Sequence, residues 1–386
     1  MKRGNKGITL IALVITIIVL LILAGVSIAT LMGENGLLTR ASESKNMTEE
    51  AEKEEKEKLE LLEKEIGRYV GNSENVLGNE NTSLNVPEGS SIIENKLEKG
   101  IVIKDKNGNE WAWVEVPKEI FTTATSNTEY EKIENDMRVY VSSTSHYTDT
   151  WIIGIGITEE KYNELKNKML KNVYTNGGFW ISRYEIGTDV ARSSPSAVLA
   201  NPESKQDSFV YNYVTQAQAQ SLASQMSPDN SLEGSLMFGI QWDLMVQYIE
   251  IKGGKSQAEI RTNSTTWGNY NNATFSIERG KYSTNPDSSS VSYTEVNGEY
   301  IKQSGINVLL TTGASERNKV LNIYDIAGNI RAWTLESFRS SSRTIRGGDF
   351  TSNGSSAATV RSGLSGSAST SASISNYTVG FRVTLM

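Results

Sequence analysis

The chain begins with a long run of uncharged, mostly apolar positions. Residues 7–33 carry no charge and are dominated by Ile, Leu and Val, and Lys2, Arg3 and Lys6 precede them. As a helix, residues 8–32 would extend about 37 Å, more than the roughly 30 Å of a bilayer's hydrocarbon core. The pattern predicts a transmembrane helix. The basic residues before it predict a cytoplasmic N-terminus, with the rest of the chain outside the cytoplasmic membrane at a bacterial cell surface.

A charged segment with helical spacing follows. Residues 43–68 contain ten acidic and six basic side chains. Apolar residues recur among and just after them at helical intervals, at Leu59, Leu62, Ile66 and Val70. This pattern predicts an exposed helix, and its apolar stripe is too short to favour a coiled coil. We therefore expect a leader and transmembrane helix at 1–33, a charged helical stalk at 34–72, a linker at 73–100 and an ectodomain at 101–386.

The start of the apolar run carries a motif, Lys6-Gly7-Ile8-Thr9-Leu10-Ile11-Ala12. Together with the helix behind it, this motif resembles the N-terminus of type IV pilins and pseudopilins. The resemblance implies peptidase cleavage between Gly7 and Ile8 and packing against other pilin-like subunits. Most pilins carry a glutamate at the position of Ala12, so this departure counts against filament assembly. A plain single-span anchor and a minor or tip-type pilin-like subunit both remain open.

Beyond residue 100 the hydrophobic pattern changes. Period-two alternation predicts strands at 110–116, 178–186 and 379–385. Helical spacing and capping residues predict helices at 158–171, 215–226 and 241–251. Long polar stretches rich in Gly, Asn and Ser separate these elements. The ectodomain is therefore expected to be an α+β domain with modest sheet content and much irregular surface.

Composition narrows the chemistry. The 386 residues include no cysteine and one histidine, and the formal net charge is −7. Without cysteine there is no disulfide, thiolate nucleophile or thiolate metal site. The one histidine, His146, lies in the polar run 143–149, which we interpret as a loop rather than part of a Ser-His-acid triad. The mild acidity counts against nucleic acid as a partner.

An ordered series of motifs runs through the ectodomain. It comprises residues 178–185 (GFWISRYE), 238–243 (FGIQWD), 322–334 (NIYDIAGNIRAWT), 346–350 (RGGDF) and 380–382 (GFR). Over about residues 100–386 this series resembles the formylglycine-generating-enzyme/sulfatase-modifying-factor domain, which has a C-type-lectin-like fold. Within it, Arg346 and Arg382 are expected to brace carboxylates or backbone carbonyls.

The resemblance also bears on activity and cofactors. The family's copper-dependent oxidation needs a pair of cysteines, and the iron-dependent relatives need several histidines, so we expect no enzyme activity and no catalytic residue. Calcium is a further family feature, but Ala332 replaces the motif's glutamate, and losing a hard oxygen ligand weakens the site. Asp325 and Asn329 remain as candidate ligands of a weak calcium site. No other cofactor is expected.

The composition changes again between Phe350 and Val379. These 28 residues include ten serines, no acid and one base, Arg361. Because family motifs lie at both ends, an ordered surface loop is expected over 351–378 rather than a low-complexity tail. In lectin-fold proteins diversified by retroelements this window is hypervariable and binds ligand, and the residue types here are reachable by changing adenines in Asn codons. The implied ligand-binding positions are Ser352, Asn353, Ser355, Ser356, Ser367, Ser369, Ser371, Ser373, Asn376 and Tyr377.

These observations lead to one main functional hypothesis. It is a non-enzymatic, membrane-anchored, surface-displayed protein that binds an unknown protein or glycan, as an adhesin or receptor would. A diversified variable protein and a tip-type pilin-like subunit are forms of this hypothesis. The alternative is an enzyme or maturation factor of the sulfatase-modifying-factor family with metal-dependent oxidase activity. A featureless serine-rich loop is the alternative for the 351–378 window.

Overall fold

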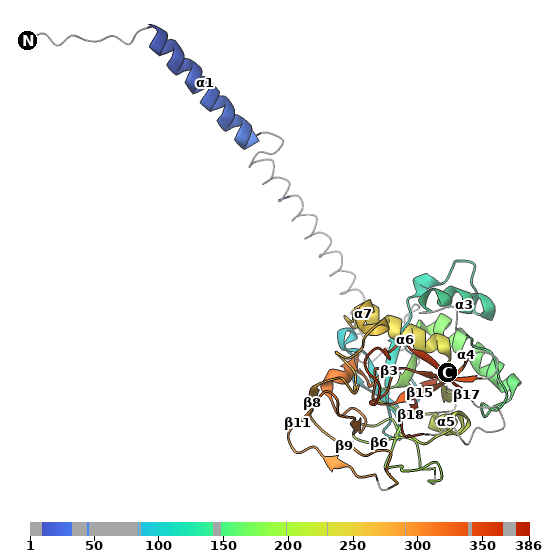
Figure 1. Cartoon of the computed structure of the whole chain (residues 1–386). Coiled ribbons are helices and arrows are strands. Elements are labelled where there is room, and N and C mark those ends of the chain that lie inside the picture. The colour runs from blue at the N-terminus through green and yellow to red at the C-terminus, as the bar shows by residue number, and fades with distance from the viewer. Residues whose placement is uncertain are drawn as a thin grey trace, which may run out of the picture. The chain divides into compact units, whose positions relative to one another are not determined.

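The computed structural model describes residues 10–32, 45, 84, 86–141, 148–197, 199–229, 231–289, 291–338, 342–365 and 376–386. The chain divides into two compact units, Met1–Asn75 and Val76–Met386. In the first unit, helix α1 spans Leu10–Met32 (Figure 1). The predicted cleavage site at Gly7 and Ile8 lies outside the described residues, as does the predicted stalk at 34–72 apart from Lys45.

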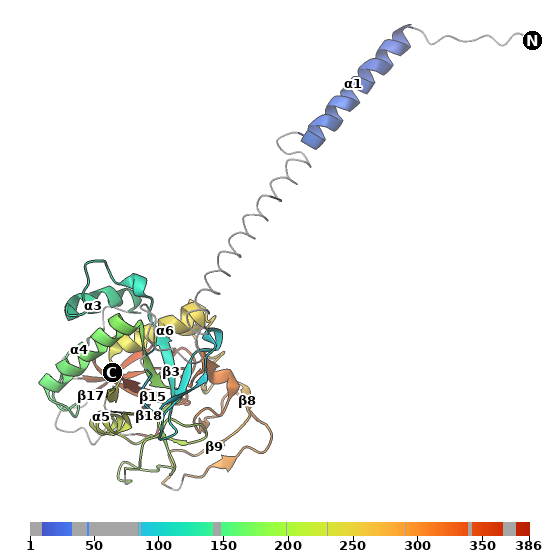
Figure 2. The ribbon, with the colours of Figure 1, turned by 180° about the vertical axis from the view of Figure 1, so that it is seen from behind.

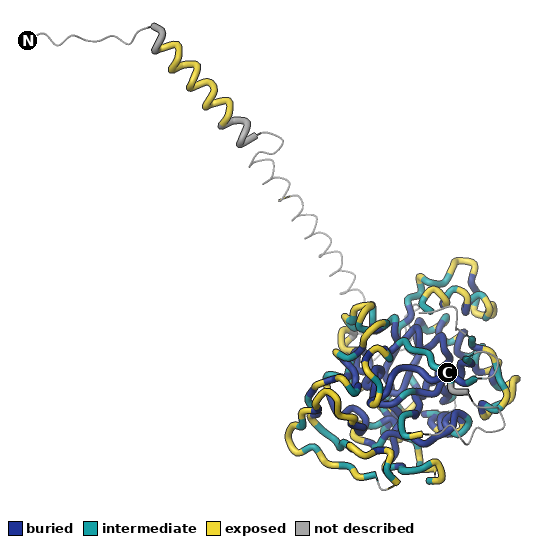
Figure 3. The backbone as a smooth tube through the Cα atoms, viewed as in Figure 1, coloured by how far each residue is buried: buried dark blue, intermediate teal, exposed yellow. Residues whose placement is uncertain are grey.

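The prediction of a transmembrane helix is wrong. In the part of the chain that the structure describes, no helix combines the length and the apolar character needed to cross a membrane. Within α1, the side chains are described from Leu13 to Val26, and all of them are exposed (Figure 3).

The second unit is a mixed α/β fold, and this corrects the predicted α+β, C-type-lectin-like class. Its described residues form six sheets, most of them small. The largest sheet is antiparallel and has the order β1-β2-β3-β4-β19-β7. Its strands are β1 (Ser91–Glu94), β2 (Val102–Lys104), β3 (Glu110–Glu115), β4 (Gly178–Ser182), β19 (Val383–Leu385) and β7 (Gly234–Leu236). The buried residues, whose backbone is coloured dark blue in Figure 3, concentrate in this unit.

A four-stranded sheet with the order β17-β16-β15-β18 carries the serine-rich window. Its strands are β15 (Arg331–Phe338), β16 (Ser342–Arg346), β17 (Arg361–Ser365) and β18 (Val379–Phe381). The predicted strand at 379–385 is in fact two strands, β18 and β19, which belong to different sheets. Arg382 separates them, is buried, and donates hydrogen bonds to the carbonyls of Ser182, at 3.0 Å, and Tyr324. It thus braces the junction between the two sheets.

The remaining strands form short ladders. They are β5 (Gly187–Thr188) with β6 (Phe209–Val210), β8 (Phe275–Ile277) with β11 (Tyr300–Lys302), β10 (Thr294–Glu295) with β9 (Lys281–Ser283) and β12 (Leu309–Leu310), and β13 (Lys319–Val320) with β14 (Ile323–Tyr324). Single 3-10 turns occur at η1 (Leu97–Lys99), η2 (Lys118–Ile120), η3 (Arg138–Tyr140), η4 (Ser224–Met226) and η5 (Glu316–Asn318). The loop-rich surface expected from the composition is therefore present.

The predicted helices are confirmed, with shifted ends. They are α4 (Glu159–Asn176), α5 (Gln216–Ala223) and α6 (Gly239–Lys252), and the structure adds α3 (Tyr130–Met137) and α7 (Gln257–Arg261). Thr158 and Thr215 cap α4 and α5 by accepting a backbone N–H with their side chains. The carboxylate of Asp149 accepts the N–H groups of Gly239 and Ile240 at the start of α6. Figures 1 and 2 both show α3 beside α4.

Four buried charges tie α6 to the four-stranded sheet. Arg346 Nη2 lies 2.6 Å from Asp243 Oδ1, and Arg346 Nη1 lies 3.2 Å from Glu336 Oε2. Arg361 contacts both carboxylates from β17. The side chains of the first three residues are fully buried, and that of Arg361 is 5% exposed. We call Asp243, Glu336, Arg346 and Arg361 the buried charge cluster. The bracing role expected for Arg346 is confirmed.

Replacing Arg346 by methionine tests how much this cluster contributes to the free energy of unfolding. Arg346→Met is expected to lower the free energy of unfolding by about 3–5 kcal/mol, because two buried carboxylates lose a partner. Urea unfolding of the full chain, followed by tryptophan fluorescence, measures the loss. The matched control is Arg261→Met, which removes a half-exposed ion pair with Glu250 and should cost less than about 1 kcal/mol. Equal losses in the two variants would contradict the assignment.

Candidate ligand-binding face

The two ends of the serine-rich window meet at the edge of the four-stranded sheet. Strands β15 and β18 pair in parallel, with Arg331 opposite Val379. The Arg331 N–H donates to the carbonyl of Thr378 at 2.9 Å. The rings of Phe350 and Tyr377, one from each end of the window, lie 6.0 Å apart between centroids. Tyr377, a predicted site residue at the end of the window, therefore lies beside Phe350, which directly precedes its start.

Asp349 fixes the start of the window. Its buried carboxylate accepts hydrogen bonds from Arg331 Nε at 2.6 Å, Ser352 Oγ at 2.8 Å and the Thr351 N–H at 2.8 Å. Arg331 Nη2 also donates to Ser352 Oγ, at 2.9 Å. The hydroxyl of Ser352 is thus engaged on both sides. Ser352, a predicted binding residue, therefore helps to hold the loop and is also partly exposed at the surface.

Beyond Ser352 the loop alternates between exposed and buried positions. Thr351, Asn353 and Ser355 are exposed, whereas Gly354 is buried. A Cβ atom at Gly354 would lie 2.0 Å from Thr265 Oγ1, so a larger residue does not fit there. The side-chain oxygen of Asn353 accepts the N–H of Ser355 at 3.0 Å and also its hydroxyl. The outward side chains thus form local hydrogen bonds, whereas Gly354 faces the rest of the unit.

The loop rests on the segment 264–273. The N–H groups of Ser264 and Asn271 donate to the carbonyls of Gly354 and Ser352, each at 2.8 Å. The side-chain oxygen of Asn272 accepts the Gly354 N–H at 3.1 Å. Tyr270 donates its hydroxyl to the carbonyl of Ser356 at 2.9 Å, and Ser356 is itself half-buried. Ser356 therefore serves mainly to hold the loop.

Aromatic rings line the other end of the window. Tyr377 is half-buried, with its ring 6.4 Å from that of Tyr213, and both Tyr377 and Tyr293 pack against a small apolar cluster. The cluster consists of Val210, Leu309, Ile330 and Phe350. Asn376 is exposed, and its backbone carbonyl accepts the N–H of Tyr213 at 3.0 Å. Burial raises the pKa values of Tyr213 and Tyr293, so both phenols stay neutral near pH 7.

We call the resulting surface the binding face. It comprises Arg331, Thr351, Ser352, Asn353, Ser355, Asn376 and Tyr377. The predicted positions Ser367, Ser369, Ser371 and Ser373 lie outside the described residues. Arg331 and Asp349 were missed as site residues. Asp349 belongs to the motif 346–350, which directly precedes the window, and could have been found from that position. Arg331 belongs to the motif 322–334 and reaches the window only through the pairing of β15 with β18.

The predicted calcium ligands are engaged inside the protein. Asp325 Oδ2 accepts the Gly313 N–H at 3.0 Å, and Asn329 Oδ1 accepts the Leu310 N–H at 3.1 Å. Asn329 also donates to Glu185 Oε2 at 2.6 Å. Within the described ranges no group of three acids or histidines is placed to hold a metal ion. The calcium site remains a prediction, and His146 lies outside the described residues.

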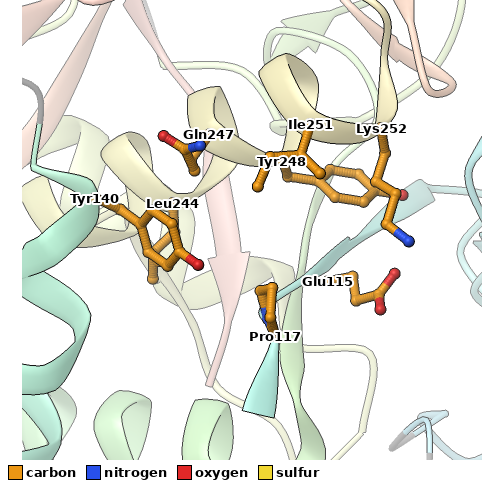
Figure 4. Close-up of a pocket in the computed structure, with 8 residues that line it drawn as sticks. All are labelled: Glu115, Pro117, Tyr140, Leu244, Gln247, Tyr248, Ile251 and Lys252. Atoms are coloured by element: carbon orange, nitrogen blue, oxygen red, sulfur yellow. The ribbon is translucent and has the colours of Figure 1, made fainter. Parts of the chain in front are cut away.

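Hollows also lie elsewhere on the described part of the second unit, and no feature of the sequence indicates them. The one in Figure 4 encloses about 290 Å³ between the end of β3 (Glu115), η3 (Tyr140) and the last turns of α6. Leu244, Tyr248 and Ile251 supply much of its apolar lining. A more polar, open hollow of about 850 Å³ is lined by Asn107, Asn109, Asp189, Asn201, Pro202, Glu203, Lys205, Gln225 and Met226.

No family model matches the chain, and no curated protein matches it. Among solved structures the chain is similar to "Treponema denticola variable protein 1", with a TM-score of 0.30 and 15% sequence identity, over 54% of this chain and 84% of that chain. At this TM-score the likeness decides neither the fold nor the function of the chain. The predicted resemblances to sulfatase-modifying factors and to pilins receive no support from these comparisons.

Asp325 provides a test of the buried interior around the motif 322–334. Burial raises the pKa of Asp325 to about 6, although its hydrogen bonds and Arg382 lower it. Its contribution to stability is therefore full below about pH 4 and is lost as the pH rises through 6. Wild type should lose up to about 3 kcal/mol relative to Asp325→Asn between pH 4 and pH 7. Urea unfolding at both pH values measures this change, and a pH-independent difference would contradict it.

Proposed function

We propose that the chain is a non-enzymatic ligand-binding protein, acting as an adhesin or receptor would, and that the binding face is its recognition surface. One observation carries the proposal. Exposed Thr351, Asn353 and Ser355 alternate with inward positions, and Asp349 with Arg331 holds the backbone beneath them. A rigid base with exchangeable outward side chains is what preorganised recognition needs, because little ordering entropy is lost on binding.

The chemistry of the face suits a protein surface or a glycan. Hydroxyl and amide groups provide adaptable hydrogen bonds, and a phenol ring provides contact area at low cost in conformational entropy. Tyr377 supplies such a ring, and Asn353, Ser355 and Asn376 supply the polar groups. The pair Arg331–Asp349 is nearly neutral as a unit, so the face is expected to favour uncharged polar ligands over nucleic acid.

Sequence composition supports binding over catalysis. The oxidase chemistry considered for this chain requires cysteines or several histidines, and the 386 residues include none of the former and one of the latter. Membrane anchoring forms no part of this proposal. Stoichiometric copper or iron in the purified protein would instead favour the enzyme.

A binding experiment tests the face directly. The full chain is applied to protein and glycan arrays, and each ligand found is titrated against the double variant Asn353→Ala/Ser355→Ala and against Tyr377→Ala. Affinity is expected to fall at least about tenfold, since truncating a central hot-spot contact costs about 2 kcal/mol or more and about 1.4 kcal/mol is already tenfold. The double variant removes both members of the hydroxyl–amide pair and leaves the exposed Ser355 N–H to water, so the melting temperature should change little.

The matched control for this experiment is Asn135→Ala. Asn135 is exposed on α3, which packs against α4 and not against the binding face. Unchanged affinity is expected for this variant. Ligands that bind all variants as tightly as wild type would sink the proposal.

Diversification by a retroelement makes a separate prediction, which gene sequencing in sibling strains can check. Variation should concentrate at the exposed positions Asn353, Ser355 and Asn376. It should spare Asp349 and Gly354, because the first supports the loop and the second has no room for a side chain. Uniform codons at the exposed positions, or substitutions spread evenly over both sets, would contradict diversification.

A further inference from the structure

Lys302, the last residue of β11, is fully buried with its ammonium group surrounded by backbone carbonyls. Nζ lies 2.8 Å from the carbonyl oxygen of Tyr270, 2.9 Å from that of Ala273 and 3.2 Å from that of Asn271. The carbonyl of Gln303 follows at 3.4 Å. An ammonium group has three N–H donors, and the three nearest carbonyls match them. Lysine is rarely buried in this way unless it is paired.

All four of these acceptors are neutral carbonyl oxygens. They can surround a cation, and no anionic side chain is among them. Distances of 2.8–3.2 Å are too long for calcium, which takes oxygen ligands at about 2.3–2.6 Å, or for magnesium. They suit a larger monovalent cation, for which backbone carbonyls replace the hydration shell. The ring of Phe275 adds a face 5.8 Å from Nζ.

The segment 264–273, which supplies three of the carbonyls around Lys302, is also the segment on which the binding face rests. Tyr270 and Asn271, whose carbonyls face Lys302, also hold Ser356 and Ser352 through a hydroxyl and an N–H group. Arg317 contacts two more carbonyls of the segment, those of Gly268 at 3.2 Å and Thr265. Two cationic side chains thus hold the 264–273 backbone, to which the 351–356 loop is also hydrogen-bonded.

We propose that the carbonyl cage around Lys302 is a monovalent-cation site that the chain fills with its own ammonium, and that this tethered cation positions the 264–273 segment beneath the binding face. The second part rests on the proposed function, and the first stands without it. Burial and the neighbouring Arg317 lower the pKa of Lys302 to about 8, so the ammonium form still predominates at pH 7. Lys302 is a positioning residue and contacts no ligand.

The first test uses the wild-type full chain with nitrogen-15-labelled lysine. A hydrogen-bonded, water-shielded ammonium exchanges its protons slowly, so the Lys302 Nζ resonance should be visible by NMR near pH 7, where exposed lysines exchange too fast. The variant Lys302→Met keeps a side chain of similar length but has no charge. The resonance that is missing from its spectrum is that of Lys302. An Nζ signal that behaves like those of exposed lysines, or that belongs to a neutral amine, overturns the proposal.

The second test empties the cage with Lys302→Ala. The melting temperature is expected to fall by about 5 °C or more, since four carbonyls lose their donor, those of Tyr270 and Ala273 in buried contacts. Potassium chloride or propylammonium chloride should restore part of this loss, whereas choline chloride at the same ionic strength is too large to enter and should not. No restoration, or equal restoration by choline, overturns the proposal. If Lys302→Ala does not fold, the wild-type resonance decides.

Hydrogen exchange connects the site to the binding face. In Lys302→Met, the amides of Asn271 and Gly354 should exchange at least about tenfold faster than in wild type. Asn271 lies on the released segment, and the Gly354 N–H bonds to the side chain of Asn272 on that segment. The Trp113 amide, which bonds to Ile101 in the six-stranded sheet, is the internal control and should change less. Equal acceleration of exchange at all three amides would mean that Lys302 contributes only to the global stability of the fold, and would overturn its positioning role. Failure of the array experiment would leave these results intact, so the two proposals are distinguishable.

Discussion

The pairing of four buried charges is the constraint on which the second unit depends. Removing an ion from water costs several kcal/mol unless partners replace the lost hydration, so each member of the buried charge cluster must meet its opposites. Asp243 comes from α6, and Glu336, Arg346 and Arg361 come from three successive strands. The cluster therefore fixes how α6 lies on the sheet. Through Arg361 it also fixes the position of the first residue of β17, and therefore the point at which the 351–360 segment ends.

The binding face follows from that geometry. Asp349 lies just after β16 and Arg361 begins β17, so the segment between them is held at both ends by buried charged groups. Its outward side chains need contribute little to stability, since the inward positions and the 264–273 segment fix the backbone. Surface positions that contribute little to stability tolerate substitution, so selection for ligand binding can set which residue stands there.

Much of the secondary structure could be predicted from the sequence, because periodicity and capping act locally. Thr158 and Thr215 marked two helix starts correctly. The buried charge cluster could not be predicted, since Asp243 and Glu336 are far apart in sequence and charged residues usually lie at the surface. Arg382 divides a continuous alternating pattern between two sheets, which alternation cannot reveal. Of the candidate site, composition singled out the window, whose binding role stays a prediction, and the approach of its two ends depends on the parallel pairing of β15 and β18.

The cage around Lys302 has a consequence for the conditions in which the protein can work. A diffusible ion leaves its site when its bulk concentration falls or when a chelator competes for it. A cation joined to the backbone by four methylene groups keeps an effective concentration that the chain itself sets, whatever the medium contains. The 264–273 segment would therefore hold its shape equally well in fresh water, brine or a chelating secretion.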